Sequence, residues 1–427
     1  LAKGKKQGEK PLVTIGKDTR ISGDLLKGSL IAGLCTAGAD VLDLGTLPTP
    51  GVAWVTVDEG ADAGIVISAS HNPFEHNGIK IFNGQGFKLS DELEEKIEDI
   101  VLFGHNDVPR KTGADIGKVS YVAPKASEDY IDHLESTIDS TLSGLRILVD
   151  CANGAASATA ARLFDRFSKL RTDVINADPD GVNINEKCGS THIDALAAMV
   201  KAGGYDIGIA FDGDADRCLA VDETGELIDG DQIMAACGLD MMNRGKLPGN
   251  TVVATSCPTW GCTSTPKEQG MNLECTTWVT ATCWSGCWRK GYKLGGEQSG
   301  HMIFLDHATT GDGQLTALQF LRLLKGLRAQ GFRAGGRLPA VSPGAGQRLC
   351  DRQRPQAGHH GLGGPQGGHL RGGAGSGGQR PYFGAPLRDR GTGPGHGGGR
   401  NRGDCQRLCQ PIGKSHKNPL IFRKELK

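Results

Sequence analysis

The chain has 427 residues, with 48 basic and 48 acidic side chains and a formal net charge of zero. This length predicts two to four domains, and the balanced charge excludes a global field that would draw the chain to nucleic acid or an anionic membrane. No run of about 18 apolar residues predicts a membrane span, and thirteen cysteines at irregular spacings favour neither a disulfide framework nor a zinc site. We therefore expect a cytoplasmic protein.

Short apolar runs alternate with helical stretches in the first third of the chain. The runs 12–16, 41–45 and 64–70 predict strands, and the stretches 25–38 and 91–103 predict helices. This alternation indicates an α/β fold with a mostly parallel sheet. Because the first strand begins so near Leu1, we expect part of the first domain to precede the chain as written.

The same pattern recurs twice further along. The segment 147–164 reads as strand, small-residue turn and helix, and a third unit ends near residue 333. Polar connections between these units set the expected domain boundaries. The four expected domains are residues 1–115, 125–235, 240–335 and 340–427.

A serine directly follows an apolar strand in the first unit. The segment GIVISASHNP places Ser70 in a turn before His71, Asn72 and Pro73. Strand ends are where α/β sheets expose reacting groups, and a hydroxyl there becomes a nucleophile or phosphoryl carrier when a cation and a proton acceptor lie beside it. The alternative is that Ser70 caps a helix, because serine is among the preferred capping residues.

Three aspartates alternate along the loop after a strand of the second unit. In GIAFDGDADRCLAVD, Asp212, Asp214 and Asp216 can converge on one hard cation, which prefers carboxylate oxygens. The spacing also matches the start of an EF-hand calcium loop, but Arg217 stands where that loop needs glycine and the flanks indicate strands. The remaining alternative is a solvated acidic turn without metal.

A glycine-rich turn precedes the apolar run MIFL in the third unit. In GGEQSGHMIFL, the side chains of Glu297, Ser299 and His301 can bind sugar hydroxyls. An ordinary hairpin with exposed polar residues gives the same local pattern, because glycine turns are common. This turn indicates a functional site only when it is considered together with the other two motifs.

Together these motifs resemble a known family. ASHNP, GIK, DGDADR and GEQSGH, in this order and at these separations, are similar to the signatures of the α-D-phosphohexomutases, from about Gly16 to Arg333. The resemblance implies three similar α/β domains with mixed, mostly parallel sheets, plus a fourth C-terminal α+β domain. With CGSTH and Gln298 the pattern is most similar to the branch that interconverts glucosamine 6-phosphate and glucosamine 1-phosphate, and the branch for mannose and glucose phosphates is the alternative.

The resemblance also implies a role for each matching residue. Ser70 would carry a phosphoryl group and, with Asp212, Asp214 and Asp216, would hold one Mg²⁺. The other implied residues are Lys80 and His301 in proton transfer, His71 in catalysis beside the serine, Arg20 and Arg217 at phosphate groups, and Glu297 and Ser299 at sugar hydroxyls.

An isomerase of this family moves a phosphoryl group between two distant oxygens by donating one that it already carries. The resemblance therefore implies a phosphoserine, a bisphosphate intermediate, and hexosamine or hexose 1,6-bisphosphate as activator, in the service of amino-sugar nucleotide synthesis. We expect a phosphosugar as the ligand, neither nucleic acid nor membrane as a partner, and a monomer or homodimer.

The tail departs from the family pattern. The phosphate-binding loop RPSGTEP of the fourth domain is absent as written, and the glycine-rich sequence beyond residue 333 predicts low order. Its glycine and arginine content is similar to an RGG nucleic-acid tail, but the aromatic residues that such binding uses are nearly missing. The resemblance implies that a chain without this loop is impaired or is an inactive phosphosugar-binding remnant.

A shifted reading frame accounts for the missing loop. The codons for residues 385–399, read one base later with free synonymous choice, can spell RPSGTEALVRVMVEG, and other frames of 256–264 and 278–288 also give family-like strings. We hypothesise that the gene encodes an intact enzyme and that the written chain carries frameshifts. Resequencing the locus tests this, because clean reads of the written frame would exclude a sequencing error.

Overall fold

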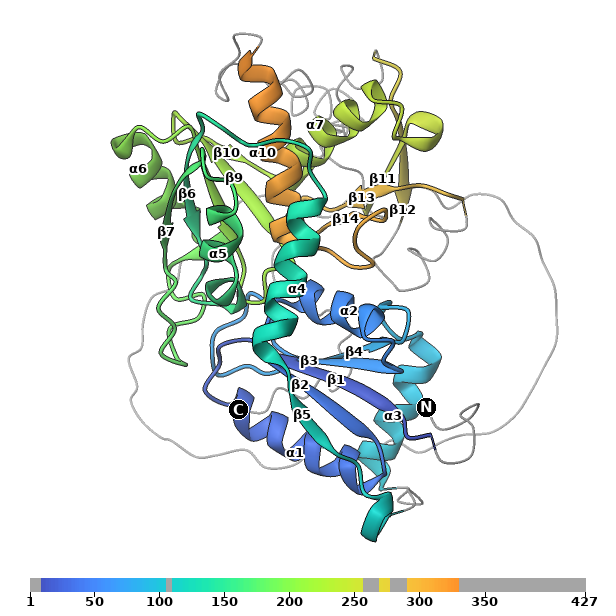
Figure 1. Ribbon diagram of the computed structural model, residues 1–427. Helices are drawn as coiled ribbons and strands as arrows, with labels where there is room; N and C mark the ends of the chain where they lie inside the picture. The colour runs from blue at the N-terminus through green and yellow to red at the C-terminus, as the bar shows by residue number, and fades with distance from the viewer. Residues whose placement is uncertain (1–8, 105–109, 256–268, 277–289, 330–427) are drawn as a thin grey trace, which may run out of the picture. The chain divides into compact units, whose positions relative to one another are not determined.

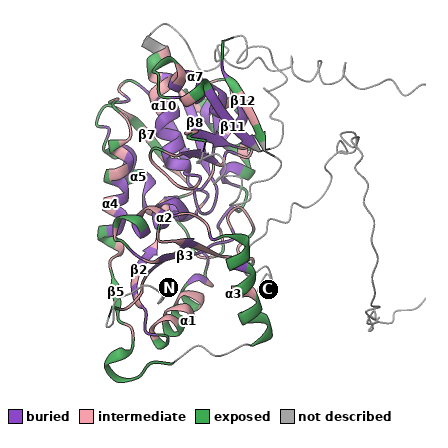
Figure 2. Cartoon of the chain, turned by 90° about the vertical axis from the view of Figure 1, so that its right-hand side faces the viewer, coloured by how far each residue is buried: buried purple, intermediate pink, exposed green. Residues whose placement is uncertain are grey.

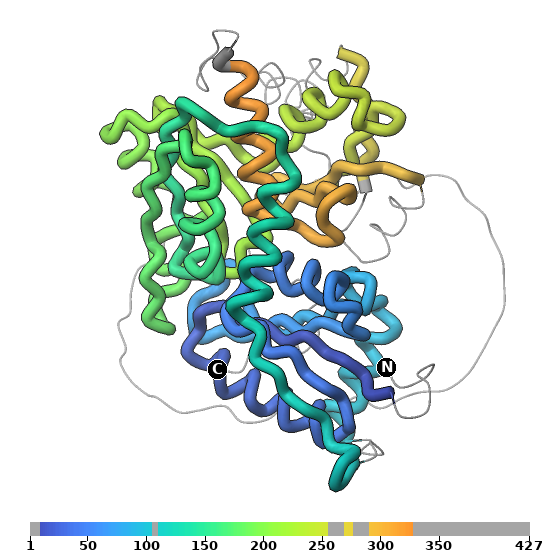
Figure 3. Tube along the Cα trace, viewed as in Figure 1, coloured from blue at the N-terminus to red at the C-terminus, as the bar shows by residue number. Residues whose placement is uncertain are grey.

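The computed structural model describes residues 9–104, 110–255, 269–276 and 290–329, which are coloured in Figure 3. The expectations for the chain start, the cysteine-rich stretches, the glycine-rich tail and the fourth domain fall largely or wholly outside the described residues. Three β-sheets with their helices make up the described part (Figure 1). This confirms the expected three α/β domains with mixed, mostly parallel sheets.

The first sheet has the strand order β4-β3-β1-β2-β5 and is parallel except for the β3–β4 pair. Its central strands are apolar and buried (Figure 2), as expected of parallel strands covered on both faces. Helix α1 packs on the face that carries Val13 and Ile65, and α2 packs on the face that carries Val66. Its elements are β1 (Leu12–Lys17), α1 (Gly23–Thr36), β2 (Asp40–Thr46), α2 (Thr49–Asp58), β3 (Ala63–Ile67), β4 (Ile79–Asn83), α3 (Asp91–Phe103), the 3₁₀ turn η1 (Gly113–Asp115) and β5 (Val119–Tyr121).

The second sheet repeats this plan with the order β10-β9-β8-β6-β7. Strands β7, β6 and β8 are parallel, and β9 and β10 continue the sheet antiparallel. Leu196 and Val200 of α6 bury one face of the sheet, and α5 and α10 pack on the other. The elements are α4 (Ala123–Ser136), β6 (Arg146–Asp150), η2 (Ala155–Ala158), α5 (Ala160–Asp165), β7 (Arg171–Ile175), η3 (Gly189–Thr191), α6 (Ile193–Gly203), β8 (Ile207–Phe211), β9 (Cys218–Asp222) and β10 (Leu227–Ile228).

The third sheet has the order β12-β11-β13-β14, with only β13 and β14 antiparallel. Helix α7 begins with a capping box, in which Asp229 and Gln232 exchange side-chain and backbone hydrogen bonds. The elements are α7 (Gly230–Asn243), η4 (Pro248–Asn250), β11 (Thr251–Thr255), β12 (Asn272–Thr276), β13 (Leu294–Gly296), β14 (Met302–Phe304) and α10 (Gly313–Ala329).

Two elements cross the expected domain boundaries. Strand β5 pairs with β2, so the first sheet extends past residue 115. Helix α7 spans the expected gap at 236–239 and packs on β11 and β13 of the third sheet. Local sequence could not assign either element to its domain. Strand β5 is short and exposed, and the assignment of α7 depends on the strands that it packs against. Among the described residues, no helix is both long and apolar enough to cross a membrane.

Helix α4 is tied to the third unit through a buried pair. The Tyr130 hydroxyl donates to Asp312 Oδ2 at 2.8 Å, and Asp312 Oδ1 accepts from Leu315 N at the start of α10. Burial raises the pKa of Asp312 to about 6, despite these donors. Because the unfolded carboxyl titrates near the usual aspartate value, the folded chain holds this proton more tightly.

This pair predicts a pH dependence of stability. The stabilisation from protonated Asp312 is complete below the unfolded pKa and is lost as the pH rises through about 6. We expect Asp312→Asn, which keeps the cap, to gain about 2 kcal/mol over the wild type between pH 4.5 and 7.5. Denaturant unfolding at several pH values measures this difference, and parallel pH curves for the two proteins would contradict it.

Candidate active site

Ser70 lies in a turn between β3 and β4 with a left-handed backbone, at φ 52°. Its hydroxyl donates to Asp212 Oδ2 at 2.6 Å, and its backbone N–H donates to Ser68 Oγ at 2.9 Å. No helix starts at this position, where the described residues continue as turn and then β4. The helix-cap alternative is therefore wrong, and the hydroxyl faces the aspartate loop.

Arg20 is buried behind the serine turn, with 1% of its surface exposed. Its Nε donates to Asp18, and its two terminal nitrogens donate to the backbone carbonyls of Ser70, Asn72 and Pro73. A guanidinium used in this way has little capacity left for a substrate phosphate. The geometry supports a role in shaping the turn, in place of the phosphate contact expected from the sequence.

The three aspartates occupy the tight connection between β8 and the antiparallel β9. All three side chains are buried, and one carboxylate oxygen from each lies within 4.8 Å of the others. The strands on both sides exclude the EF-hand, and burial excludes a solvated acidic turn. Of the sequence alternatives, a cation site is the one that this geometry supports.

The first domain supplies the groups that hold these carboxylates. Lys80 Nζ lies 2.5 Å from Asp214 Oδ2 and 3.1 Å from Asp216 Oδ2. Thr49, at the start of α2, donates its hydroxyl to Asp214 Oδ2 at 2.5 Å. These donors all use Oδ2 atoms, while Oδ1 of Asp214 and Oδ1 of Asp216 are buried without a hydrogen-bond partner among the described residues.

These two oxygens fit a hard cation. A buried carboxylate oxygen without a partner is costly, and a divalent ion bound by oxygen ligands removes that cost. Burial and the charges of Asp216 and Asp214 also raise the pKa of Asp212, because three carboxylates crowd one site. Burial would lower the pKa of Lys80, but Asp214 and Asp216 outweigh it and raise that pKa, so the amine keeps its proton.

His71 and Arg217 meet at the edge of the aspartate loop. Arg217 Nη1 donates to His71 Nδ1 at 3.1 Å, while Nε of Arg217 lies 3.9 Å from Asp216 Oδ1 and makes no hydrogen bond among the described residues. Burial and the Arg217 charge lower the pKa of His71. The neutral ring accepts at Nδ1 and so carries its proton on Nε2, which makes it a donor.

The GEQSGH turn closes the hairpin between β13 and β14. Ser299 donates its hydroxyl to Glu297, and His301 Nε2 accepts from Gly311 N at 3.2 Å. When neutral, the His301 ring carries its proton on Nδ1, which lies 3.6 Å from Asp216 Oδ1. Burial would lower the pKa of His301, but the Asp216 carboxylate outweighs it and raises that pKa. The hairpin expected as an alternative is present, and it brings His301 to the aspartates.

Sequence reasoning missed two residues that contact this site. Thr49 is the threonine of LPTP, residues 47–50, at the start of a helix. Asn185 lies in the loop before CGSTH, where its amide contacts the serine turn. Neither residue has a local signal for chemistry. Their contacts join residues 165 and 115 positions apart, which only the folded chain reveals.

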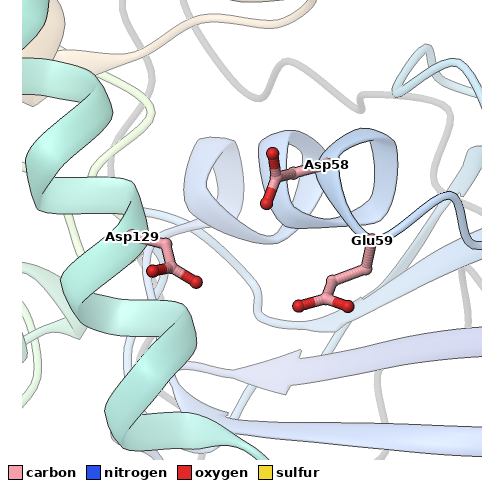
Figure 4. A group of neighbouring side chains, drawn as sticks. All are labelled: Asp58, Glu59 and Asp129. Carbon is pink, nitrogen blue, oxygen red and sulfur yellow. The ribbon is translucent and has the colours of Figure 1, made fainter.

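A second acidic group lies between α2 and α4 (Figure 4). It consists of Asp58, Glu59 and Asp129, of which Asp58 and Glu59 are exposed. Lys125 Nζ pairs with Glu59 at 2.9 Å and with Asp129 at 2.8 Å. The lysine pairs with two of the three carboxylates, so the group is an ion-paired contact between helices.

Three family models match the chain. They are described as Phosphoglucomutase/phosphomannomutase, alpha/beta/alpha domain I, domain II and domain III, and they match residues 2–106, 128–225 and 229–333. These ranges contain each of the residues singled out from the sequence motifs.

Curated relatives are similar over the same part of the chain. Phosphoglucosamine mutase of Ruminiclostridium cellulolyticum is 51% identical over 316 residues, covering 74% of this chain and 70% of the relative. That of Brevibacillus brevis is 49% identical over 321 residues, covering 75% and 71%.

Solved structures share the fold. A phosphoglucomutase/phosphomannomutase family protein from Burkholderia thailandensis has a TM-score of 0.63 at 28% identity, covering 74% of this chain and 69% of that one. The N-acetylphosphoglucosamine mutase of Aspergillus fumigatus, solved with GlcNAc-6P and magnesium, has a TM-score of 0.50 at 17% identity and covers 79% and 67%. At that identity the second likeness shows the fold alone.

Proposed function

The chain belongs to the α-D-phosphohexomutase family as an isomerase of the phosphoglucosamine mutase type, and we propose that Ser70 carries the phosphoryl group that it transfers. The reaction interconverts glucosamine 6-phosphate and glucosamine 1-phosphate. The observation that supports Ser70 in this role is its hydroxyl, which lies 2.6 Å from Asp212 in a buried group of three carboxylates.

In the first transfer, the phosphorus–oxygen bond to Ser70 breaks and a new one forms to the free hydroxyl of the sugar phosphate. A bisphosphate results, and after it reorients, its other phosphoryl group returns to Ser70. The phosphoryl oxygens keep their charge throughout, so catalysis depends on positioning and on nearby positive groups. Lys80 and Arg217 provide these charges at the aspartate loop.

Each transfer also moves one proton from the attacking hydroxyl to the departing oxygen. Lys80 holds its proton and lies beside Asp214, so we propose that it donates to the Ser70 oxygen. His301 accepts the proton of the sugar hydroxyl at Nε2, giving up its hydrogen bond from Gly311. His71, with its proton on Nε2, donates a hydrogen bond to a phosphoryl oxygen.

We propose Mg²⁺ as the resident cation, because the ligands are hard oxygens and Oδ1 of Asp214 and Oδ1 of Asp216 accept no hydrogen bond among the described residues. Asp212, Asp214 and Asp216 would hold it together with the oxygen on Ser70. When bound, it neutralises charge on the transferring phosphoryl group. The side chains of Glu297 and Ser299 are the proposed contacts for sugar hydroxyls, and hexosamine or hexose 1,6-bisphosphate is the proposed activator.

Substrate choice tests the proposed specificity. We expect purified protein, supplied with Mg²⁺ and a hexose 1,6-bisphosphate, to turn over glucosamine 1-phosphate with a kcat/KM at least about tenfold above that for mannose 1-phosphate. That ratio corresponds to about 1.4 kcal/mol of transition-state discrimination. Coupled assays on both sugars measure it, and equal or faster turnover of the mannose phosphate would refute the preference.

A further inference from the structure

Two backbone carbonyls of the serine turn are each bound by the same two donors. Arg20 Nη2 donates to Ser70 O at 3.0 Å and to Asn72 O at 2.9 Å. Asn185 Nδ2 donates to the same two oxygens, at 2.9 Å and 3.1 Å. An amide nitrogen has two hydrogens, so both of them are used on this turn.

The turn requires such support because its backbone is strained. Ser70 has φ 52°, a left-handed conformation that is unfavourable for a residue with a Cβ and persists only where surrounding contacts hold it. The turn is also pressed against the aspartate loop. A Cβ on Gly213 would lie 2.6 Å from Ser70 O and 2.7 Å from Asn185 Nδ2, so only glycine permits this approach.

The two donors come from different domains. Arg20 belongs to the first domain, as Ser70 does, and Asp18 fixes its guanidinium. Asn185 belongs to the second domain, which also carries Asp212, Asp214 and Asp216. Asn185 therefore ties the backbone of the serine turn to the unit that holds the aspartates, whereas Arg217 of that unit contacts the turn through the His71 side chain.

Asn185 is itself firmly held in the second domain. It is 7% exposed, its φ of 60° suits asparagine, and its N–H donates to Ala152 O at 2.9 Å. Buried Asp150 accepts from Ala152 N and from Gly189 N, so it closes the loops on both sides of Asn185. A rigid amide is what a positioning contact needs.

We propose that Asn185 is a positioning residue for phosphoryl transfer, fixing the Ser70 oxygen relative to the aspartate group across the domain boundary. This rests on the proposed role of Ser70. Without the amide, the carbonyls of Ser70 and Asn72 keep only the donor from the first domain, Arg20. The turn then meets the second domain through the side chains of Ser70 and His71, and the Ser70 oxygen is held less firmly at the carboxylates. The loss falls on the transfer step, because Asn185 makes no contact with the residues proposed to bind sugar hydroxyls among the described parts of the chain.

The test compares Asn185→Gly with Lys187→Gly in the full chain. Lys187 is an exposed residue of the same loop at φ 53°, so glycine there makes the same backbone change away from the serine turn. We expect Asn185→Gly to lower kcat about 10- to 100-fold with KM within about twofold. Lys187→Gly should leave both within about twofold.

Hydrogen exchange supplies a readout that needs no turnover. We expect peptides covering residues 68–77 to exchange roughly tenfold faster in Asn185→Gly, and as in wild type in Lys187→Gly. Should Asn185→Gly fail to fold, Asn185→Asp keeps the size and removes the donors, and it should give the same kinetic and exchange changes. Wild-type exchange in the serine turn, or faster exchange with unchanged kcat, would overturn the proposal.

Failure of the proposed function would look different. If Ser70→Ala retained turnover, the proposed phosphoserine would be refuted. The hydrogen-exchange result would still test whether Asn185 anchors the serine turn. If Ser70→Ala lost turnover and Asn185→Gly matched wild type in both readouts, the positioning role alone would be wrong.

Discussion

Replacing Ser70 by alanine is expected to lower kcat by on the order of 10⁴-fold or more. The variant loses the hydroxyl that would carry the phosphoryl group, and no other hydroxyl among the described residues takes its place beside Asp212. Mass spectrometry of the active protein should find phosphate on the Ser70 peptide, and this phosphate should be absent from Ser70→Ala. The substitution removes one hydrogen bond, from the Ser70 hydroxyl to Asp212, so the protein should still fold.

Ser90→Ala is the matched control for this change. Ser90 is an exposed serine of the same domain that precedes α3 without a side-chain capping bond. It should keep both the turnover and the phosphate of the wild type. An unphosphorylated Ser70 in a fully active preparation, or full activity in Ser70→Ala, would remove the basis of the proposed transfer and favour a protein that only binds phosphosugars.

Asp214→Asn is expected to have the second largest effect. It keeps the shape of the side chain but removes the charge of an oxygen that lies buried without a partner, Oδ1. We expect the Kd for Mn²⁺, used as a spectroscopic substitute for Mg²⁺, to rise at least about 100-fold and kcat to fall on the order of 10³-fold. Electron paramagnetic resonance of free Mn²⁺ during a titration gives the affinity.

The second acidic group provides the control for the metal prediction. Asp58 also lies beside two other carboxyl groups, but it is exposed, and Lys125 pairs with its neighbours. Asp58→Asn should leave the Mn²⁺ affinity within about twofold of wild type. Unchanged Mn²⁺ affinity in Asp214→Asn, or an equal loss in Asp58→Asn, would mean that the cation lies elsewhere.

The sequence predicted the parts of the site that each follow one strand. Ser70 comes after β3, and Asp212 begins the loop after β8, so apolar runs that end in polar turns were sufficient to mark them. The order of the motifs, which is that of the family, predicted in addition that these loops lie close together in the folded chain. The hydrogen bond between Ser70 and Asp212 agrees with that expectation.

The sequence could not predict how these turns are held. The burial of Arg20 behind the turn could not be predicted, because it depends on Asp18 and on carbonyls about fifty positions further along the chain. Thr49 and Asn185 went unnoticed because a threonine at a helix start and an asparagine in a loop are common for local reasons. The strings read from shifted frames, including the phosphate loop, lie outside the described residues.

In the active protein, a phosphate on Ser70 is expected to lie beside a divalent ion bound by Asp212, Asp214 and Asp216. Pulsed electron–nuclear double resonance on the phosphorylated protein loaded with Mn²⁺ tests it directly, because phosphorus in contact with the ion gives a ³¹P coupling. We predict such a coupling in the wild type and its loss in Ser70→Ala. Tightly bound Mn²⁺ with no ³¹P coupling, in protein that carries the phosphate, would contradict the account.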